Sequence, residues 1–131
     1  MRRTPLALLL VAFACTACSP GDSERRAAEQ AAAREFDGNA ARDALVAALD
    51  AWKQGKAKQL DRRLPPIRFA DDDMASGWAL VGYELRDTPI VPMKDVPVTL
   101  LLRDRRGQSL RREAHYQVAT FPALVVHRTD F

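Results

Sequence analysis

The spacing of hydrophobic residues along this chain changes from helical to alternating near residue 65. Over 40–54, Leu45, Leu49 and Trp52 recur at three- and four-residue intervals between charged residues, which predicts an amphipathic helix. Gly55 ends this helix, and Pro65-Pro66 excludes a further one there. Beyond this point the period becomes two, which predicts a short extended piece at 67–69 and strands at 78–86, 96–103, 110–120 and 123–128.

A helix followed by an antiparallel meander predicts an α+β fold. We expect N-terminal helices packed on one face of a curved antiparallel sheet of three to four strands, with Trp52 between the layers. Strand alternation predicts an inner sheet face made of Ala79, Val81, Tyr83, Leu85, Val96, Val98, Leu100, Leu102, Ala114, Tyr116 and Val118. Because the period is two, a one-residue bulge would reverse this assignment.

The order of elements resembles the cystatin-like and nuclear-transport-factor-2-like architectures, in which a helix is followed by a curved sheet of long strands. Residues 40–128 also resemble small exported bacterial domains whose family implies no known activity. The motifs that carry this second resemblance are Ala51-Trp52-Lys53-x-Gly55, Pro65-Pro66-Ile67, Val81-x-Tyr83-x-Leu85, Val96-Pro97-Val98-x-Leu100-x-Leu102-x-Asp104-x-x-Gly107, and Tyr116-x-Val118 with Pro122.

The first eighteen residues have the layout of an export signal. Two arginines precede a nine-residue apolar run, 6–14, which is far shorter than the roughly 20 residues of a membrane-spanning helix. Small residues then lead to Cys18, and the segment resembles a bacterial lipoprotein signal with Cys18 as the lipidated residue. Cys15 is the competing acceptor. Cleavage without lipidation after Ala14 or Ala17, an uncleaved anchor and a Cys15–Cys18 redox pair are the alternatives.

This interpretation divides the chain into a signal peptide at 1–17, a tether with an alanine-rich helical stalk at 18–38, and a single α+β domain at 39–131. Asp22 lies too far from Cys18 to act as an inner-membrane retention signal. We therefore expect an exported lipoprotein, anchored in the outer membrane and facing the periplasm.

Charge argues against a nucleic-acid partner. The formal net charge of +3 falls to +1 once Arg2 and Arg3 are removed with the signal, leaving 18 Lys and Arg against 17 Asp and Glu. Nucleic-acid binders normally carry a clustered cationic surface. Both cysteines lie in the signal region, so the domain itself has no disulfide framework.

The predicted interior offers little chemistry. Tyr83 and Tyr116 carry its two polar atoms, and with Trp52 they are the candidate lining of a small-ligand pocket. Core tyrosines whose hydroxyls reach the sheet rim are the favoured interpretation. We predict no catalytic residue, because Glu84, Glu113 and His115 fall on the opposite face of the strands.

Three further clusters favour structural roles. His115 and His127 are too few for a zinc site, and 71–73 lacks the ligand spacing of a calcium loop, so we expect capping and solubility from these aspartates. The hairpin arginines would protect a sheet edge or contact anionic lipid or glycan. They are Arg103, Arg105, Arg106, Arg111 and Arg112.

The sequence thus predicts a membrane-tethered envelope lipoprotein with a non-catalytic binding or structural role, no metal and no cofactor. Its partners would be the membrane, through the N-terminal lipid, and an envelope protein. One version places that protein on the exposed strand face with Leu80, Leu101 and the arginine hairpin. The alternative is an isomerase- or dehydratase-like pocket between helix and sheet that uses Tyr83 and Tyr116.

Overall fold

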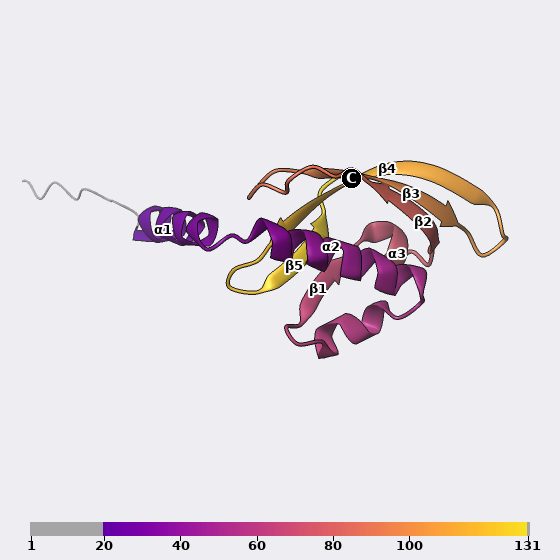
Figure 1. The fold of residues 1–131 in the computed structure, drawn as a ribbon, viewed down its shortest axis with the longest axis horizontal. Coiled ribbons are helices and arrows are strands. Elements are labelled where there is room, and N and C mark those ends of the chain that lie inside the picture. The colour runs from indigo at the N-terminus through magenta and orange to yellow at the C-terminus, as the bar shows by residue number, and fades with distance from the viewer. Residues whose placement is uncertain (1–19, 131) are drawn as a thin grey trace, which may run out of the picture.

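A computed structural model describes residues 20–130, and it confirms the α+β class. Four helical segments accompany one sheet of five strands in this part of the chain (Figure 1). The helical segments are α1 (Pro20–Arg34), α2 (Gly38–Lys53), the 3₁₀ helix η1 (Ala57–Arg62) and α3 (Asp72–Ala75). The strands are β1 (Ile67–Ala70), β2 (Ala79–Leu85), β3 (Val96–Arg103), β4 (Ser109–Ala119) and β5 (Leu124–Arg128).

The sheet is mixed and curls into a half-barrel, with the strand order β1-β5-β4-β3-β2. Strands β2 to β5 form the expected antiparallel meander. The prediction of a wholly antiparallel sheet of three to four strands is inexact, because β1 adds to the edge in parallel with β5. No local turn indicates this pairing in the sequence, because the two strands lie more than fifty residues apart in the chain.

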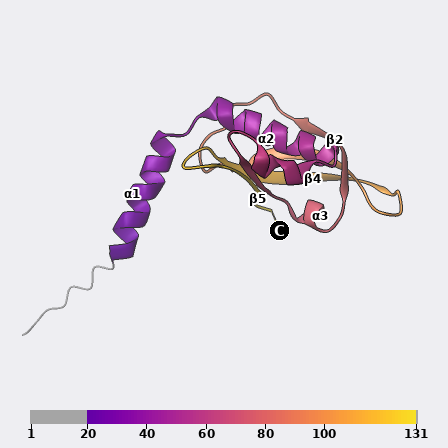
Figure 2. The ribbon, with the colours of Figure 1, turned by 90° about the horizontal axis from the view of Figure 1, so that it is seen from below.

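Helix α2 lies across the concave face of the sheet (Figures 1 and 2). The carboxylate of Asp37 caps its start by accepting hydrogen bonds from the backbone N–H groups of Asn39 and Ala40. Gly55, with a φ of 71°, follows its end as expected. The side of α2 that faces the sheet is made of Ala41, Ala44, Leu45, Ala48, Leu49 and Trp52, all buried. The three alanines in this set are small enough to let the helix approach the strands closely.

The alternation predicted for β3 and β4 is confirmed, whereas that for the start of β2 is wrong. A bulge at Val81 shifts the register between Leu80 and Gly82. Leu80 therefore faces the core, 3% exposed and opposite Leu102, while Ala79 is exposed. Tyr83 and Leu85, beyond the bulge, point inward as predicted. Leu80 is thus unavailable to a partner on the outer face, although Leu101 lies there and is exposed.

Helix α1 projects from the body of the domain at the end where α2 begins (Figure 2). Nearly all of its described side chains are exposed, and only its last turns lie beside the loops that follow β2 and β4. None of the helices described within 20–130 combines the length and the hydropathy needed to cross a bilayer. Cys18, the predicted lipidation site, lies outside the described residues.

Candidate functional site

An open groove of about 940 Å³ lies at the end of α2 that is remote from α1. Its walls come from η1, β1, α3 and the start of β2. The apolar lining is formed chiefly by Trp52, Ile67, Phe69, Met74 and Trp78, and charged lining by Lys58, Asp61 and Arg68. Phe69, Met74 and Trp78 are only partly buried, so the groove offers accessible aromatic and thioether surface.

Trp52 forms the floor of the groove and joins its walls. It lies in the last turn of α2 and is 6% exposed. Its indole N–H donates a hydrogen bond of 3.0 Å to the backbone carbonyl of Trp78, and its ring lies 6.2 Å from that of Phe69. One side chain therefore fixes the end of the helix to β1 and to the segment that enters β2.

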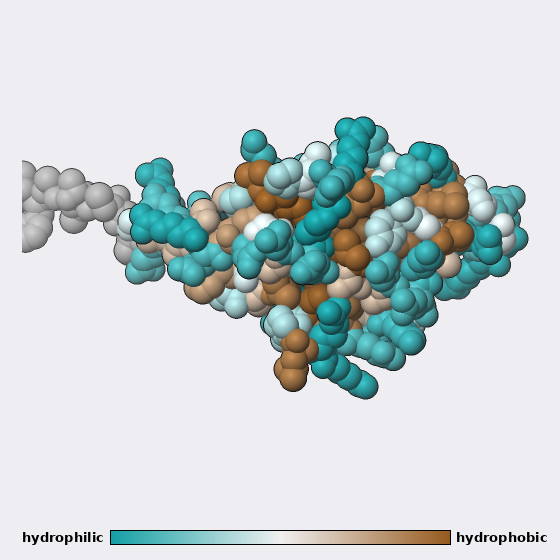
Figure 3. All heavy atoms as spheres, in the orientation of Figure 1, coloured by the Kyte–Doolittle hydropathy of each residue, from teal (hydrophilic) through white to brown (hydrophobic). Residues whose placement is uncertain are grey.

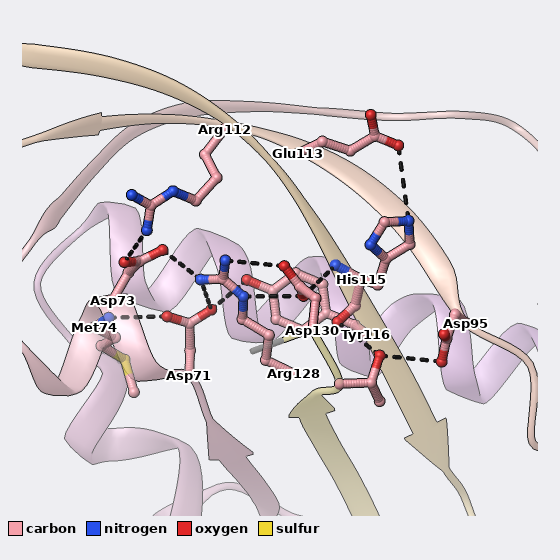
Figure 4. A network of polar contacts seen from close by, with 11 residues as sticks. Asp71, Asp73, Met74, Asp95, Arg112, Glu113, His115, Tyr116, Arg128 and Asp130 are labelled. Atoms are coloured by element: carbon pink, nitrogen blue, oxygen red, sulfur yellow. Dashed lines mark hydrogen bonds and ion pairs between the residues drawn. The ribbon is translucent and has the colours of Figure 1, made fainter.

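A buried polar network holds the wall formed by α3 (Figure 4). One oxygen of Asp71 accepts the N–H of Met74 at 2.9 Å and so caps α3. The other oxygen accepts the hydroxyl of Tyr116 at 2.5 Å. The Asp71 side chain is fully buried. The start of α3 is thereby fastened to the centre of the sheet.

Arg128 is the central cation of this network. Its guanidinium pairs with Asp73, lies 3.7 Å from Asp71 and makes two hydrogen bonds of 3.1 Å to Asp130. Arg112 donates a hydrogen bond to the second oxygen of Asp73 at 2.5 Å. The side chain of Arg128 is only 7% exposed. Among the described residues no buried side-chain nitrogen or oxygen lacks a partner, so the network is internally satisfied.

The electrostatics keep Arg128 and Asp130 charged and Tyr116 protonated. Burial alone would lower the pKa of Arg128, but hydrogen bonds to Asp130 and Asp73 outweigh it and raise the pKa. Burial would raise the pKa of Asp130, and hydrogen bonds from Arg128 and from the His115 N–H outweigh it and lower the pKa. Burial, reinforced by the Asp71 carboxylate, raises the pKa of Tyr116. The network is therefore suited to positioning α3 and Phe69 rather than to exchanging protons.

Alkaline titration tests this assignment, because the protein contains two tyrosines. Burial, with help from Asp50, raises the pKa of Tyr83 to about 12, and that of Tyr116 lies above its usual range for the reasons given. Both should ionise near pH 10 in the unfolded chain. We expect the phenolate absorbance of the native protein to stay low through about pH 11 and to rise near pH 10 in denaturant.

The sign of the linked stability follows from these raised values. Both tyrosines stabilise the fold fully below the unfolded pKa near 10, and this contribution declines as the pH rises beyond it. Two phenolates that appear near pH 10 while the fold persists would contradict the buried placement of Tyr116, because Tyr83 can account for only one of them.

The structure separates the three candidate pocket residues. Trp52 lines the groove, and Tyr116 lies behind the wall, with its ring 6.3 Å from that of Phe69. Tyr83 is on β2, where its hydroxyl donates to Asp50 at 2.7 Å. It lines a separate shallow surface depression that includes neither of the other two.

The aspartates at 71–73 are placed differently from the prediction. Capping by Asp71 is confirmed, but a solubility role is wrong for Asp71 and Asp73, because both are buried and paired. Arg112 points inward to Asp73 rather than joining the hairpin cluster, whereas Arg111 pairs with Glu84 at 3.2 Å on the outer face. Within 20–130, no three His, Cys, Asp or Glu side chains gather as metal ligands would.

Alternation along the strands does indicate two residues of the network, Arg112 and Arg128, that were not predicted as inward-facing. Arg112 shares the parity of Ala114 and Tyr116, and Arg128 shares that of Val126. No protein-family model matches this chain, and comparison with curated proteins and with solved structures finds no match. The groove, the network behind it and the N-terminal segment are therefore the features that bear on function.

Proposed function

We propose that this chain is a membrane-tethered domain of the cell envelope that binds a partner protein, without catalysis, in the groove at the end of α2. The observation that carries the proposal is the partly exposed aromatic lining of that groove, at the end of the helix remote from α1. The tether is the lipid on Cys18. We place the anchor in the outer membrane, with the domain in the periplasm.

The N-terminal segments suit this arrangement. A basic, apolar and small-residue leader precedes Cys18. The 15 residues of α1 then form a polar helix about 22 Å long, at 1.5 Å per residue. Because its described side chains are largely exposed, α1 has little apolar surface with which to pack and is suited to serve as a stalk. It would hold the groove away from the bilayer.

Binding has more support than catalysis. An isomerase- or dehydratase-like mechanism would use the hydroxyls of Tyr83 and Tyr116, but Tyr116 is fully buried and its hydroxyl is bonded to Asp71. The accessible part of the site is aromatic and aliphatic, which is the chemistry of recognition. On the face seen in Figure 3, hydrophobic residues reach the surface in separate areas between polar ones. We also propose that the fold is similar to the cystatin-like and nuclear-transport-factor-2-like architectures. The helix on the concave face of a curled sheet supports this similarity.

Photo-crosslinking in intact cells tests the proposal. A photoreactive residue replaces Ala75, which lines the groove and is exposed, and a matched variant carries it at Leu101, which is exposed on the outer face of the sheet. We expect a discrete adduct from position 75, recovered with the membrane fraction, and none from position 101. The Cys18→Ser variant should move the protein and any adduct to the soluble fraction.

Two results would contradict different halves of the proposal. Wild-type protein in the soluble fraction, or mass spectrometry showing an unmodified Cys18 thiol, would refute the tether. Equal crosslinking from positions 75 and 101, or none from either, would refute the groove as the binding surface.

A further inference from the structure

β1 is an edge strand with an unused side. It pairs with β5 along Ile67–Ala70, and no other hydrogen bond joins these four residues to the described part of the chain. In a parallel ladder, alternate residues direct both N–H and C=O away from the partner strand. The consecutive residues 67–69 all line the groove. A cavity on one face of a strand would contact only every second residue, so the groove borders the edge of β1. The groove therefore offers main-chain donors and acceptors beside its aromatic lining.

The segment that leads into this edge is strongly cationic. Residues 56–68 contain five Lys and Arg against the single acid Asp61. Within 20–130 none of these five cations forms an ion pair. Lys58 and Arg68 line the groove, and Arg62 and Arg63 line the neighbouring depression between η1 and α2. Basic strands would be repelled from this edge, and acidic ones attracted.

We infer that the groove takes an extended acidic segment of the partner protein, which adds as a strand along β1. An apolar side chain of that segment would lie on Trp52, Phe69 and Trp78, while its carboxylates face Lys58 and Arg68. Main-chain hydrogen bonds would supply affinity and alternate side chains specificity. The inference rests on the proposed function and names its class of partner.

A concave site beside a strand edge favours a peptide over a bilayer, because a flat lipid surface would leave both the edge and the floor at Trp52 unused. The direction of the added strand is set by the partner. Charge at the rim makes the interaction sensitive to salt, since exposed charges are screened within about 8 Å at physiological ionic strength.

Selection from a display library of random peptides on the full chain tests the inference. We expect the selected peptides to carry Asp or Glu around an aromatic or aliphatic residue. N-methylation of alternate peptide amides should weaken binding by about tenfold or more at each position, and methylation of the intervening amides should have little effect. Trp78→Ala should weaken the same peptides by about tenfold or more, and Arg68→Glu by a similar factor. The matched control, Leu101→Ala on the outer sheet face, should leave binding unchanged.

Each of the other possible results would refute a specific part of the inference. Peptides that lose binding in Trp78→Ala but tolerate methylation without a period of two would refute strand addition and leave the binding function standing. Peptides indifferent to Trp78→Ala, or no selected peptide at all, would refute the groove as a peptide site. The Cys18→Ser chain can also be tested with anionic phosphatidylglycerol vesicles. If it binds them and Arg68→Glu abolishes that binding, the partner of the groove is a bilayer and not a peptide.

Discussion

Replacing Arg128 with alanine is expected to lower the free energy of unfolding by about 3–5 kcal/mol. Arg128 faces Asp73, Asp71 and Asp130, and its side chain is almost wholly buried. Removing it leaves carboxylates inside the protein without their main counter-charge, and the cost of that desolvation exceeds the worth of the pair itself. This is a large share of the stability of a domain of this size, which is typically about 5–15 kcal/mol.

Urea denaturation measures the loss, and the exposed pair on the outer face supplies the control. Arg111→Ala breaks the ion pair with Glu84, and we expect a change of less than about 1 kcal/mol. Arg128→Lys retains the charge without the forked donors and should lie between Arg128→Ala and wild type, which keeps the test usable if the alanine variant does not fold. An Arg128→Ala chain that unfolds within about 1 kcal/mol of wild type would show that the network is not closed as described.

The stability that Arg128 contributes should also depend on pH in the acidic range. The lowered pKa of Asp130 means that its contribution is present above the unfolded value near pH 4 and is lost as the pH falls through the folded value. The stability difference between wild type and Arg128→Ala should therefore shrink in that acidic range.

Replacing Trp52 with alanine is the second large change, with an expected loss of about 3–5 kcal/mol. The substitution opens a cavity between α2 and β1, where the ring of Trp52 meets that of Phe69. It also leaves the carbonyl of Trp78 without the indole N–H that it accepts. The floor of the groove is lost at the same time, so binding there should fail even in chains that remain folded.

Thermal and urea unfolding check this result, and Trp52→Phe separates its two causes. Phenylalanine keeps much of the apolar volume but lacks the N–H, so we expect a smaller loss of about 1–3 kcal/mol. A Trp52→Ala variant as stable as Trp52→Phe would indicate that the interior repacks around the gap.

Local patterns predicted the parts of the fold that depend on near neighbours. The burial of Val98 and Leu100 on β3 and of Ala114 on β4 follows directly from alternation. The bulge at Val81 could not be foreseen, because Leu80 and Val81 are both apolar and either can face the core. The parallel pairing of β1 was not predicted for a different reason. Its four residues are too short a pattern to indicate a partner strand far away in the sequence.

The polar network shows where such reasoning stopped. Alternation alone assigns Arg112 and Arg128 to the concave face, and two inward cations require buried acids. Nothing local identifies those acids, because Asp73 is 39 residues from Arg112 and 55 from Arg128. An aspartate before a helical turn is also the ordinary signature of a cap, and Asp71 performs that role while pairing with Tyr116 as well. The groove could not be foreseen either, since its walls combine four separate elements.

The parallel pairing of β1 with β5 has a dynamic consequence. β1 is short and hydrogen-bonds to a single neighbouring strand, which begins more than fifty residues further along the chain, so this pairing closes a long loop during folding. Trp52 and the network around Asp71 hold β1 in place, but its outer edge has no main-chain partner within 20–130, so we expect the amides on that edge to exchange with solvent more readily than those of the meander. A strand bound along this edge would cover those amides, and occupancy would be measured as slower hydrogen exchange along β1.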